Sequence, residues 1–429
     1  MNFIEELRWR GMLQDMIPGL EDQLAKEMTV AYIGFDPTAP SLHIGNLAAI
    51  MLLKHFQLCG HKPIALVGGA TGMIGDPSGK AAEREFLSED TLRANQIGIQ
   101  KQLEKFLEFH AGANSAEVVN NYDWFKEFSF LGFLREAGKF LTVNYMMSKD
   151  SVKKRLETGI SFTEFSYQLL QGYDFYHLYK TKNVRLQMGG SDQWGNITTG
   201  TEIIRRKEGH DEDSTERAAF ALTTPLVTKA DGTKFGKSES GNVWLDAEKT
   251  SPYAFYQFWL NAADADVPRL IRVFTLYTKD QIADLEKQHA EAPHLRILQK
   301  AVAEEVTTRV HGAEVCALVI EASTLLFSKD AVELIAGASD ALLGQLPIHE
   351  VSAELLDECK NLTDLISVGT DNLIFPSKGE ARKAIQNNAI SVNKVKVTDP
   401  NAALDFEKIR GQYLLVGNGK QKNYILSFK

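Results

Sequence analysis

The sequence predicts an α/β fold in which helices cover a parallel β-sheet, followed by an α-helical region and a small α+β unit. Short apolar segments alternate with longer segments of helical spacing through the first half of the chain. That alternation is typical of a parallel sheet buried on both faces. From about residue 251 to 327 the spacing is helical, and the chain ends in a mixture of one helix and short strands. A ligand site is therefore expected at the carboxyl ends of the sheet strands.

The individual elements follow from apolar spacing and from the glycine and proline residues that end each run. Strands are expected at 29–34, 63–68, 118–119, 184–188 and 221–228. A helical N-terminal segment is expected over 3–28, and further helices are expected at 47–58, 89–109 and 161–179. The terminal unit should contain a helix at 377–387, a strand at 390–393 and a hairpin of 413–416 with 424–428. The Gly- and Ala-rich residues 336–348 are expected to form a linker.

Composition narrows the class of protein. The 429 residues suffice for two or three domains, and 44% apolar with 24% charged residues is ordinary for a globular protein. We expect neither a signal peptide nor a membrane helix, since no apolar run approaches the roughly 20 residues that such a helix needs. The three cysteines, Cys59, Cys316 and Cys359, are far apart. They suggest neither a disulfide framework nor a zinc site, so a cytoplasmic protein without a resident metal is expected.

Charge is distributed unevenly along the chain. The formal net charge is −9, yet residues 376–429 carry ten Lys and Arg against four Asp and Glu. A basic segment at the end of an acidic body indicates a nucleic-acid contact confined to that end. The alternative is a solvated charged helix.

Residues 122–160 interrupt the alternation of strands and helices with aromatic and Met-rich sequence. Such side chains either pack in the core or form a subunit interface, where aromatic residues and Met are enriched. The sequence leaves both interpretations open.

Residues 41–46, Ser-Leu-His-Ile-Gly-Asn, join an expected strand to an expected helix. The N–H groups and the dipole at a helix start favour an anion. His43 can add a donor to a phosphate, and Gly45 allows a flat ligand to approach the backbone. Alone, this motif is most often only a turn.

A second candidate for phosphate binding is the segment 229–238, which contains three lysines and two glycines after an expected strand. Mobile ammonium groups can follow a polyphosphate as charge builds in a transition state. A solvated turn is the simpler interpretation. Two such motifs on one scaffold are much more specific than either alone.

The helix expected at 161–179 carries a polar stripe. Ser161 and Glu164 have capping-box spacing. Tyr167, Gln171 and Asp174 then fall on one helix face. We expect this stripe to line an amino-acid pocket, with a buried polar network as the alternative.

The same motifs bring a resemblance to a known family. His43-Ile-Gly-Asn46 and Lys234-Phe-Gly-Lys237-Ser238 resemble the two signatures of class I aminoacyl-tRNA synthetases. Longer stretches resemble bacterial-type tyrosyl-tRNA synthetases: Gly34-Phe-Asp-Pro-Thr-Ala39, Leu66-Val-Gly-Gly-Ala-Thr-Gly72, Ile74-Gly-Asp-Pro77, Ile160-Ser-Phe-Thr-Glu-Phe-Ser-Tyr167 and Gly189-Gly-Ser-Asp-Gln-Trp-Gly-Asn196. The resemblance extends from about Tyr32 into the terminal basic unit.

The resemblance implies three domains and an activity. A Rossmann-like catalytic domain would span 1–245, with a dimer-interface insertion at about 122–160. An α-helical tRNA-contacting domain would span 246–335, and an S4-like RNA-binding domain 350–429. The implied activity is that of a tyrosine–tRNA ligase, which uses ATP with Mg²⁺ and L-tyrosine, charges tRNA(Tyr), forms a homodimer and contacts no membrane.

The resemblance also implies roles for individual residues. Tyrosine-binding residues would be Tyr32, Asp76, Tyr167, Gln171, Asp174, Gln187 and Gln193. ATP-binding residues would be Gly34, Asp36, His43, Gly45, Asn46, Gly190, Asp192, Lys234 and Lys237. The reaction would be carried by Thr38, His43, Lys80, Arg84, Lys234 and Lys237. RNA-binding residues would be Lys378, Arg382, Lys383, Lys420 and Lys422.

Three positions depart from the common pattern of the family. Asn46 replaces a histidine found in many members, Ile33 replaces a cysteine that touches the ribose, and Ala49 lacks a hydroxyl that some relatives have. We expect these differences to change ATP affinity without loss of the reaction.

Three other functions remain as alternatives. They are a sister synthetase that charges tryptophan, a non-catalytic RNA-binding protein on the same scaffold, and a small-molecule adenylyltransferase. Tyr32 and Asp174 disfavour the first, because an indole offers one N–H donor. The intact signatures disfavour the second, and the basic terminal unit disfavours the third.

Overall fold

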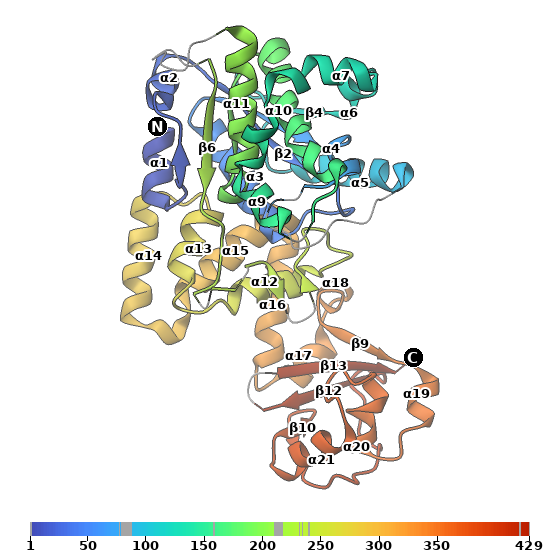
Figure 1. Ribbon diagram of the computed structural model, residues 1–429. Helices are drawn as coiled ribbons and strands as arrows, with labels where there is room; N and C mark the ends of the chain where they lie inside the picture. The colour runs from blue at the N-terminus through green and yellow to red at the C-terminus, as the bar shows by residue number, and fades with distance from the viewer. Residues whose placement is uncertain are drawn as a thin grey trace. The chain divides into compact units, whose positions relative to one another are not determined.

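The computed structural model describes residues 2–76, 78, 88–157, 159–209, 218–230, 232–233, 235–238, 241–419 and 422–428 (Figure 1). The chain forms two compact units. The N-terminal unit comprises Met1–Lys249 and Leu260–Val310, and the C-terminal unit comprises Thr250–Trp259 and His311–Lys429.

A six-stranded sheet forms the centre of the N-terminal unit. Its strands are β1 (Asp15–Met16), β2 (Val30–Phe35), β3 (Lys62–Val67), β4 (Glu117–Asn120), β5 (Val184–Gly190) and β6 (Phe220–Thr224). Their order is β1-β6-β5-β2-β3-β4, and all pairs are parallel except β1 with β6. The expected parallel sheet is therefore confirmed. The chain runs outward from β2 in both directions, so β2 and β5 form the topological switch point.

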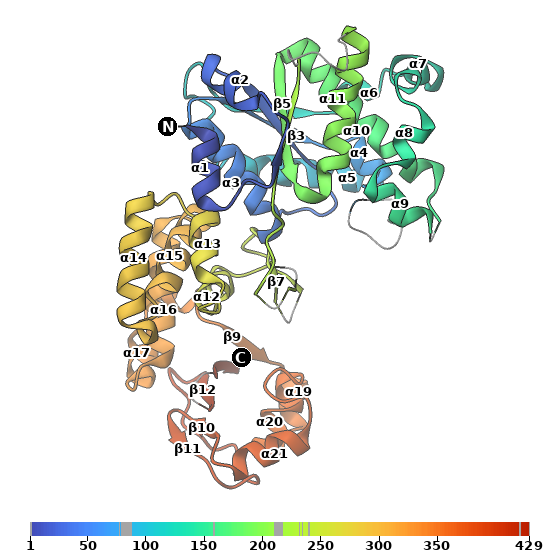
Figure 2. The same cartoon turned by 60° about the vertical axis from the view of Figure 1, so that its left-hand side comes forward.

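Helices cover both faces of this sheet. The crossover helices are α3 (Ile44–Leu58), α5 (Glu89–Leu103), α10 (Phe162–Lys182) and α11 (Trp194–Glu208). Helices α3 and α5 pack on β3, whereas α10 and α11 pack on β5 and lie side by side (Figure 2). Right-handed crossovers that run in opposite directions from β2 place these two pairs on opposite faces.

One prediction for the start of the chain is wrong. Residues 3–28 form α1 (Phe3–Arg10) and α2 (Leu20–Lys26), and between them β1 pairs antiparallel with β6. A two-residue strand depends on tertiary pairing, which leaves no local apolar pattern to recognise.

In its described residues, the insertion at 122–160 contains four short α-helices and one 3-10 turn, Gly138–Phe140. The α-helices are α6 (Tyr122–Phe125), α7 (Phe130–Glu136), α8 (Val143–Met147) and α9 (Asp150–Leu156). The remaining short elements of the unit are α4 (Thr71–Ile74) and the pair β7 (Lys237–Ser238) and β8 (Gly241–Asn242).

The expected helical region is present, and the two units share it. Helices α13 (Val267–Phe274), α14 (Lys279–Glu291) and most of α15 (Ile297–His311) belong to the N-terminal unit. Arg10 of α1 donates to the carbonyls of Arg272, Thr275 and Tyr277 at the end of α13. Helices α12 (Pro252–Leu260), α16 (Ala313–Phe327), α17 (Ala331–Gly337) and α18 (Asp340–Leu343) lie in or mostly in the C-terminal unit.

The C-terminal unit contains a five-stranded sheet in the order β11-β10-β12-β13-β9. Its strands are β9 (Ile348–Val351), β10 (Ile390–Val392), β11 (Val395–Lys396), β12 (Tyr413–Asn418) and β13 (Lys422–Phe428). The helices are α19 (Ala353–Asp357), α20 (Leu362–Leu365) and α21 (Lys378–Gln386). The predicted terminal helix and hairpin are confirmed.

The linker predicted at 336–348 is wrong. This segment includes α18, and it reaches the start of β9. Leu342, Leu343 and Leu346 are buried against Leu415 and Ile425. The Gly and Ala content suggested flexibility, but three leucines at helical spacing decide the local structure because they join a core.

Within the described part of the chain, no helix is long and apolar enough to cross a membrane.

Candidate active site

The candidate site lies where β2 and β5 adjoin. Tyr32 of β2 and Gln187 of β5 are partners in register, so their side chains project from the same face of the sheet. Both residues are buried, at 1% and 2% exposure. Neither the Tyr32 hydroxyl nor Gln187 Oε1 has a hydrogen-bond partner among the described residues. Unpaired buried polar atoms are uncommon, and two together indicate a place prepared for a polar ligand.

Asp174 of α10 faces this pair and is held by two donors. Trp124 Nε1 donates to its Oδ1 at 2.9 Å, and Asn121 Nδ2 donates to its Oδ2 at 3.0 Å. Burial raises the pKa of Asp174 well above its usual value, while these two donors favour its ionised form. Burial, and secondly the charge of Asp174, likewise raises the pKa of Tyr32. Asp174 and Tyr32 thus form a dry corner with polar groups able to hydrogen-bond a ligand.

A polar chain connects this corner to the loop after β2. Tyr167 donates to Asp36 Oδ2 and Thr71 donates to Asp36 Oδ1, both at 2.8 Å. Asn121 Nδ2 also approaches Thr71 Oγ1 at 3.1 Å. Burial, followed by the charge of Asp36, raises the pKa of Tyr167. Asp36 was assigned to ATP, but both of its oxygens accept hydrogen bonds from side chains on the tyrosine side.

Sequence reasoning missed three members of this arrangement, namely Thr71, Asn121 and Trp124. Asn121 and Trp124 directly follow β4, and Thr71 follows β3. Polar residues just past the carboxyl end of a parallel strand were the available signal.

The predicted α-amino contact Asp76 lies beside the end of β5. Gln193 Nε2 donates to Asp76 Oδ2 at 2.7 Å, and Asn196 Nδ2 approaches Oδ1 at 3.4 Å. The structure thus brings Asp76 and Gln193 together. Gln171 lies half-buried on the α10 face that carries Tyr167 and Asp174.

The predicted adenosine side is formed by exposed backbone and one carboxylate. Gly34 is the one exposed residue of β2, whose other residues are buried. Gly190 ends β5, and the exposed Asp192 follows in the next turn. A Cβ on Gly190 would lie 2.7 Å from an Asp192 oxygen, so a larger residue would require the Asp192 side chain to turn away from this backbone.

The start of α3 differs from the simple anion site expected from sequence. His43 is the N-cap, and its Nδ1 accepts from the Gly45 amide at 3.0 Å. The Ile44 amide donates to Val243 and the Asn46 amide to the His43 carbonyl. These first amides are therefore already satisfied, because the His43 ring, the His43 carbonyl and the Val243 carbonyl supply their acceptors. A phosphate must use the helix dipole and side-chain donors.

The Gly45 and Asn46 roles change accordingly. A Cβ on Gly45 would lie 2.7 Å from the ring of His43, so the glycine makes room for this ring. Asn46 Oδ1 accepts from the His43 amide at 3.1 Å and completes a capping box. Since Nδ1 of His43 accepts, the neutral ring carries its proton on Nε2.

The two signature motifs lie against each other. A Cβ on Gly236 would be 3.2 Å from the Gly45 nitrogen, and the backbone at Gly236 has the left-handed φ of +94° that favours glycine. Lys237 is in β7, paired in register with Asn242. The predicted phosphate residues Lys80, Arg84 and Lys234 lie outside the described residues. Thr38 is exposed in the loop before α3.

The capping box predicted at the start of α10 is half wrong. Ser161 Oγ accepts from the Glu164 amide at 3.1 Å, as expected. The Glu164 carboxylate turns instead to Arg155, with two contacts at 2.7 and 3.0 Å. Both side chains are buried, so this is a buried bidentate ion pair that joins the insertion to α10.

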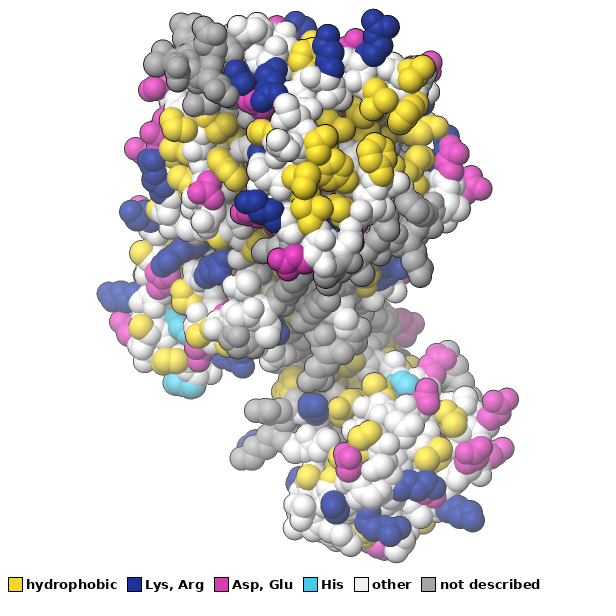
Figure 3. Space-filling view, viewed as in Figure 1, with side chains coloured by type: hydrophobic (Ala, Val, Ile, Leu, Met, Phe, Trp, Pro, Cys, Tyr) yellow, Lys and Arg dark blue, Asp and Glu magenta, His cyan; other side chains and the backbone are white. Residues whose placement is uncertain are grey.

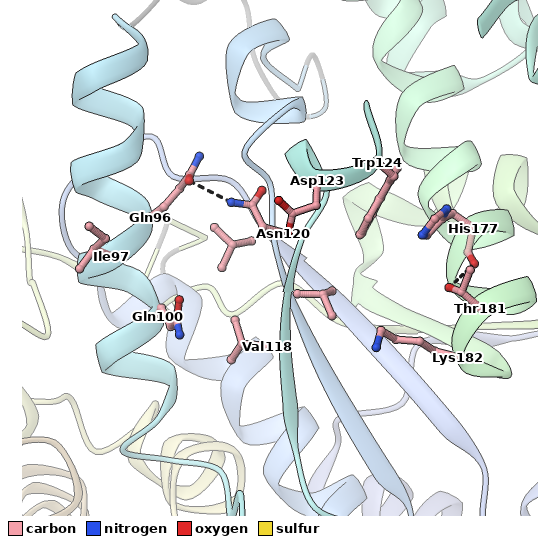
Figure 4. A pocket seen from close by; sticks show the side chains of 12 residues that line it. Gln96, Ile97, Gln100, Val118, Asn120, Asp123, Trp124, His177, Thr181 and Lys182 are labelled. Carbon is pink, nitrogen blue, oxygen red and sulfur yellow. Dashed lines mark hydrogen bonds between the residues drawn. The ribbon is translucent and has the colours of Figure 1, made fainter. Parts of the chain in front are cut away.

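A cavity of about 510 Å³ lies beyond Asp174, between α5, β4 and α10 (Figure 4). Trp124 stacks on His177 in its wall, with ring centroids 4.4 Å apart. None of the predicted tyrosine or ATP residues is among its described lining residues. No group of three His, Cys, Asp or Glu able to hold a metal occurs within the described ranges.

The predicted RNA residues lie on the C-terminal unit. Arg382 and Lys383 are exposed on α21, and Lys422 is exposed at the start of β13. Lys378 Nζ pairs with Asp364 at 2.7 Å, so part of its charge is neutralised within the unit. Lys420 lies outside the described residues.

Comparison with known proteins identifies the family. A family model described as tRNA synthetases class I (W and Y) matches residues 24–328, in agreement with the sheet and the two adjoining motifs. This match makes the fold that of a class I aminoacyl-tRNA synthetase. A second model, the Tyrosine--tRNA ligase SYY-like C-terminal domain, matches residues 343–427. The chain belongs to the tyrosine–tRNA ligase family.

Individual relatives agree along the whole chain. Tyrosine–tRNA ligases of Cytophaga hutchinsonii and Amoebophilus asiaticus are 60% and 58% identical. These alignments cover 100% and 99% of this chain, and 99% of each relative. The crystal structure of a C-terminally truncated mitochondrial tyrosyl-tRNA synthetase of Coccidioides posadasii matches with a TM-score of 0.66 and 31% identity, covering 75% of this chain and 91% of that one.

Proposed function

We propose that the protein forms tyrosyl-adenylate and pyrophosphate from tyrosine and ATP at the junction of β2 and β5, and then transfers the tyrosyl group to tRNA(Tyr). One observation carries the choice of tyrosine. The unpaired Tyr32 hydroxyl and the doubly held Asp174 carboxylate meet in a dry corner. The phenol O–H of a bound tyrosine can donate to the Asp174 carboxylate, and its oxygen can accept from the Tyr32 hydroxyl. Tryptophan offers one N–H and no acceptor there, so it satisfies fewer of these groups.

The first step needs no side chain as nucleophile. A carboxylate oxygen of tyrosine attacks the α-phosphorus of ATP, a P–O bond forms, and the bond to the pyrophosphate leaving group breaks. Catalysis then depends on positioning and on stabilisation of the negative charge that develops on the leaving group. We assign that stabilisation to Thr38 and His43, together with Lys234 and Lys237 of the segment 229–238. We assign further phosphate contacts to Lys80 and Arg84.

The remaining contacts divide between the two substrates. We assign the tyrosine α-amino group to Asp76, Tyr167 and Gln171, near Gln193 and Gln187. We assign the adenosine to Gly34, Gly190 and Asp192, with a carboxylate accepting from ribose hydroxyls. Mg²⁺ accompanies ATP as part of the substrate, held largely by phosphate oxygens and water.

Exchange of labelled pyrophosphate into ATP tests the first step directly. We expect exchange that depends on tyrosine, little with phenylalanine, and none with tryptophan. Lys234→Ala should lower the rate of adenylate formation far more than the affinity for tyrosine. Exchange supported better by tryptophan, or by no amino acid, would overturn the proposal.

The protein also presents an apolar surface that fits a second copy of the chain. Large exposed apolar side chains cluster on α7, α8 and the start of α10, and Figure 3 shows apolar side chains gathered in the region of α7. They are Phe130, Leu131, Leu134, Val143, Met147 and Phe162, exposed by 36–71%. A monomer rarely exposes such a group, whereas homodimer interfaces are rich in aromatic residues and Met.

Other aromatic residues of the insertion pack internally. Phe125, Phe128 and Phe133 surround Tyr173 with ring centroids 5.2–6.1 Å apart. Both interpretations of residues 122–160 therefore have support, each for its own side chains. Light scattering should give twice the chain mass for the unaltered protein and the single mass for Leu131→Glu. A monomeric unaltered protein would contradict the homodimer.

We assign tRNA binding partly to α21 and the adjoining strands. Arg382 and Lys383 are exposed and can neutralise phosphates. The double variant Arg382→Ala, Lys383→Ala should have a lower rate of tRNA charging, and that rate should depend less steeply on salt concentration. Its pyrophosphate exchange should be unchanged. Charging that is unaffected at every salt concentration would exclude α21 as the contact.

The free cysteines Cys59, Cys316 and Cys359 suit the reducing cytoplasm, where we place the protein.

A further inference from the structure

Helix α5 holds the loop between β2 and α3 at three points. Asn95 Nδ2 donates to the Pro37 carbonyl at 2.9 Å. Two turns further along α5, Gln102 Nε2 donates to Ser41 Oγ at 2.9 Å, and Gln102 Oε1 accepts from the Leu42 amide at 2.8 Å. Asn95 is only 3% exposed, so its bond to the loop is protected from water.

Gly98 lies between these two tethers on α5. A Cβ on Gly98 would lie closer than 3.0 Å to the carbonyl oxygen of Pro40, which is backbone and cannot rotate away. Residues 95, 98 and 102 share one face of a helix. The face of α5 is thus shaped to receive loop 37–42, with amides at both ends and no side chain in the middle.

Other contacts also hold the loop, and the Leu42 carbonyl accepts from the Leu245 amide at 2.9 Å and from Ser41 Oγ at 2.7 Å. The Thr38 amide donates to the Asp36 carbonyl at 2.8 Å in a tight turn, and Pro37 packs on Gly72, where a Cβ would lie 2.9 Å from its ring. Loop 37–42 carries Thr38 and leads directly into His43. Any displacement of the loop therefore moves both residues that we assign to the ATP phosphates.

We propose that Asn95, Gly98 and Gln102 are positioning residues, which set the affinity and orientation of ATP by fixing loop 37–42 without touching the nucleotide. This inference rests on the proposed placement of the ATP phosphates at Thr38 and His43. Displacing a substrate-positioning loop by about 1 Å costs up to about a hundredfold in rate. Tyr32 and Asp174 lie on the sheet face that α10 covers, whereas α5 packs on the opposite face, so tyrosine binding should be preserved.

Two variants disturb the loop by different means. Gly98→Ala introduces a methyl group against the Pro40 carbonyl, and Asn95→Ala removes a donor without adding bulk. Each should lower kcat/KM for ATP in pyrophosphate exchange by about tenfold. Tyrosine affinity, measured by equilibrium dialysis without ATP, should change by less than about twofold. Active-site titration corrects every rate for the fraction of folded enzyme.

Matched controls separate positioning from a general effect on folding. Lys101→Ala alters an exposed residue of the same helix, and Gly337→Ala adds a methyl group to helix α17 where no atom lies within 4 Å. Both should retain the unaltered kinetics. Gln102→Glu keeps the acceptor for the Leu42 amide but loses the donor to Ser41 Oγ, so it should restore part of the ATP affinity that Gln102→Ala loses.

The outcomes are distinguishable from those that concern the function itself. Absence of tyrosine-dependent exchange in the unaltered protein would overturn the proposed function. Normal exchange in that protein, with ATP parameters changed less than about twofold in both Gly98→Ala and Asn95→Ala, would overturn the positioning role alone. A parallel loss of tyrosine affinity in both variants would overturn it as well, because that pattern marks a merely structural effect.

Discussion

Replacing Tyr32 by phenylalanine should have opposite effects on stability and on substrate binding. The Tyr32 hydroxyl is buried and has no hydrogen-bond partner among the described residues. An unpaired buried polar group costs about 1–3 kcal/mol, and Tyr32→Phe removes that group without altering the ring. The Phe175 ring, 5.5 Å from Tyr32 and edge-on, keeps its contact. The free enzyme should therefore gain about 1–2 kcal/mol of stability.

The same change removes one hydrogen bond to the substrate phenol. A neutral hydrogen bond contributes about 0.5–1.5 kcal/mol, which corresponds to a loss of about threefold to tenfold in tyrosine affinity. Phenylalanine makes no bond to this hydroxyl, so its affinity should not fall. Discrimination between the two amino acids should narrow by the same factor.

Calorimetry and pyrophosphate exchange measure these two effects on one pair of proteins. We expect the ligand-free Tm of Tyr32→Phe to rise by about 2–4 °C. Tyr145→Phe is the matched control, because the Tyr145 hydroxyl donates to the Thr198 carbonyl and accepts from Lys149. The control should lose stability. A Tm that falls in Tyr32→Phe, or tyrosine affinity that stays unchanged, would refute the reasoning.

Three further predictions follow from buried charge. Burial, and then the charges of Arg10 and Arg309, lowers the pKa of His55 to about 3, so only the unfolded chain binds its proton as pH falls from 6.5 toward 3. Between pH 6.5 and pH 4, the free energy of unfolding should therefore fall by about 3 kcal/mol more in the unaltered protein than in His55→Leu. Urea unfolding at each pH measures this difference, and parallel profiles for the two proteins would contradict the prediction. Arg155→Met leaves the Glu164 carboxylate buried without its partner and should cost about 3–5 kcal/mol by calorimetry, whereas Arg155→Met with Glu164→Leu should regain most of it. Trp124→Phe removes a donor to Asp174 and should raise the pKa of that carboxyl further, moving the acid limb of tyrosine binding to higher pH, and an unmoved limb would exclude the bond.

Local pattern was sufficient for the central part of the fold. The apolar runs at β2, β3 and β5 are continuous because both faces of each strand are buried, and such runs are visible without a structure. The strand β1 is two residues long and exists only because it pairs with β6. Residues 336–348 looked flexible by composition, yet three leucines in that segment join a core whose other half is more than 60 residues away. Long-range partners decided both cases.

At the site too, the sequence indicates which residues take part, whereas their hydrogen-bond and ion-pair partners are known only from the structure. Tyr32, Asp174 and Gln187 were expected on the tyrosine side, and the structure places them together at the end of the sheet. The carboxylate of Glu164 pairs with the buried guanidinium of Arg155 and does not complete the capping box at the helix start.

The start of α3 shows what a motif alone cannot reveal. The spacing at His43 indicated a free helix start, but the amide acceptors come from the His43 ring, the His43 carbonyl and Val243. The last of these is about 200 positions along the chain. Donor satisfaction of this kind depends on the fold and leaves no mark in the local sequence.

A structure with bound L-tyrosine tests the central claim most directly. The account places the phenol oxygen about 2.6–3.2 Å from both the Tyr32 hydroxyl and an Asp174 carboxylate oxygen, with Trp124 and Asn121 still donating to that carboxylate. The substrate carboxylate should point toward the junction of the His43 and Gly236 backbones. A phenol ring bound elsewhere, with the Tyr32 hydroxyl still lacking a partner, would contradict the account.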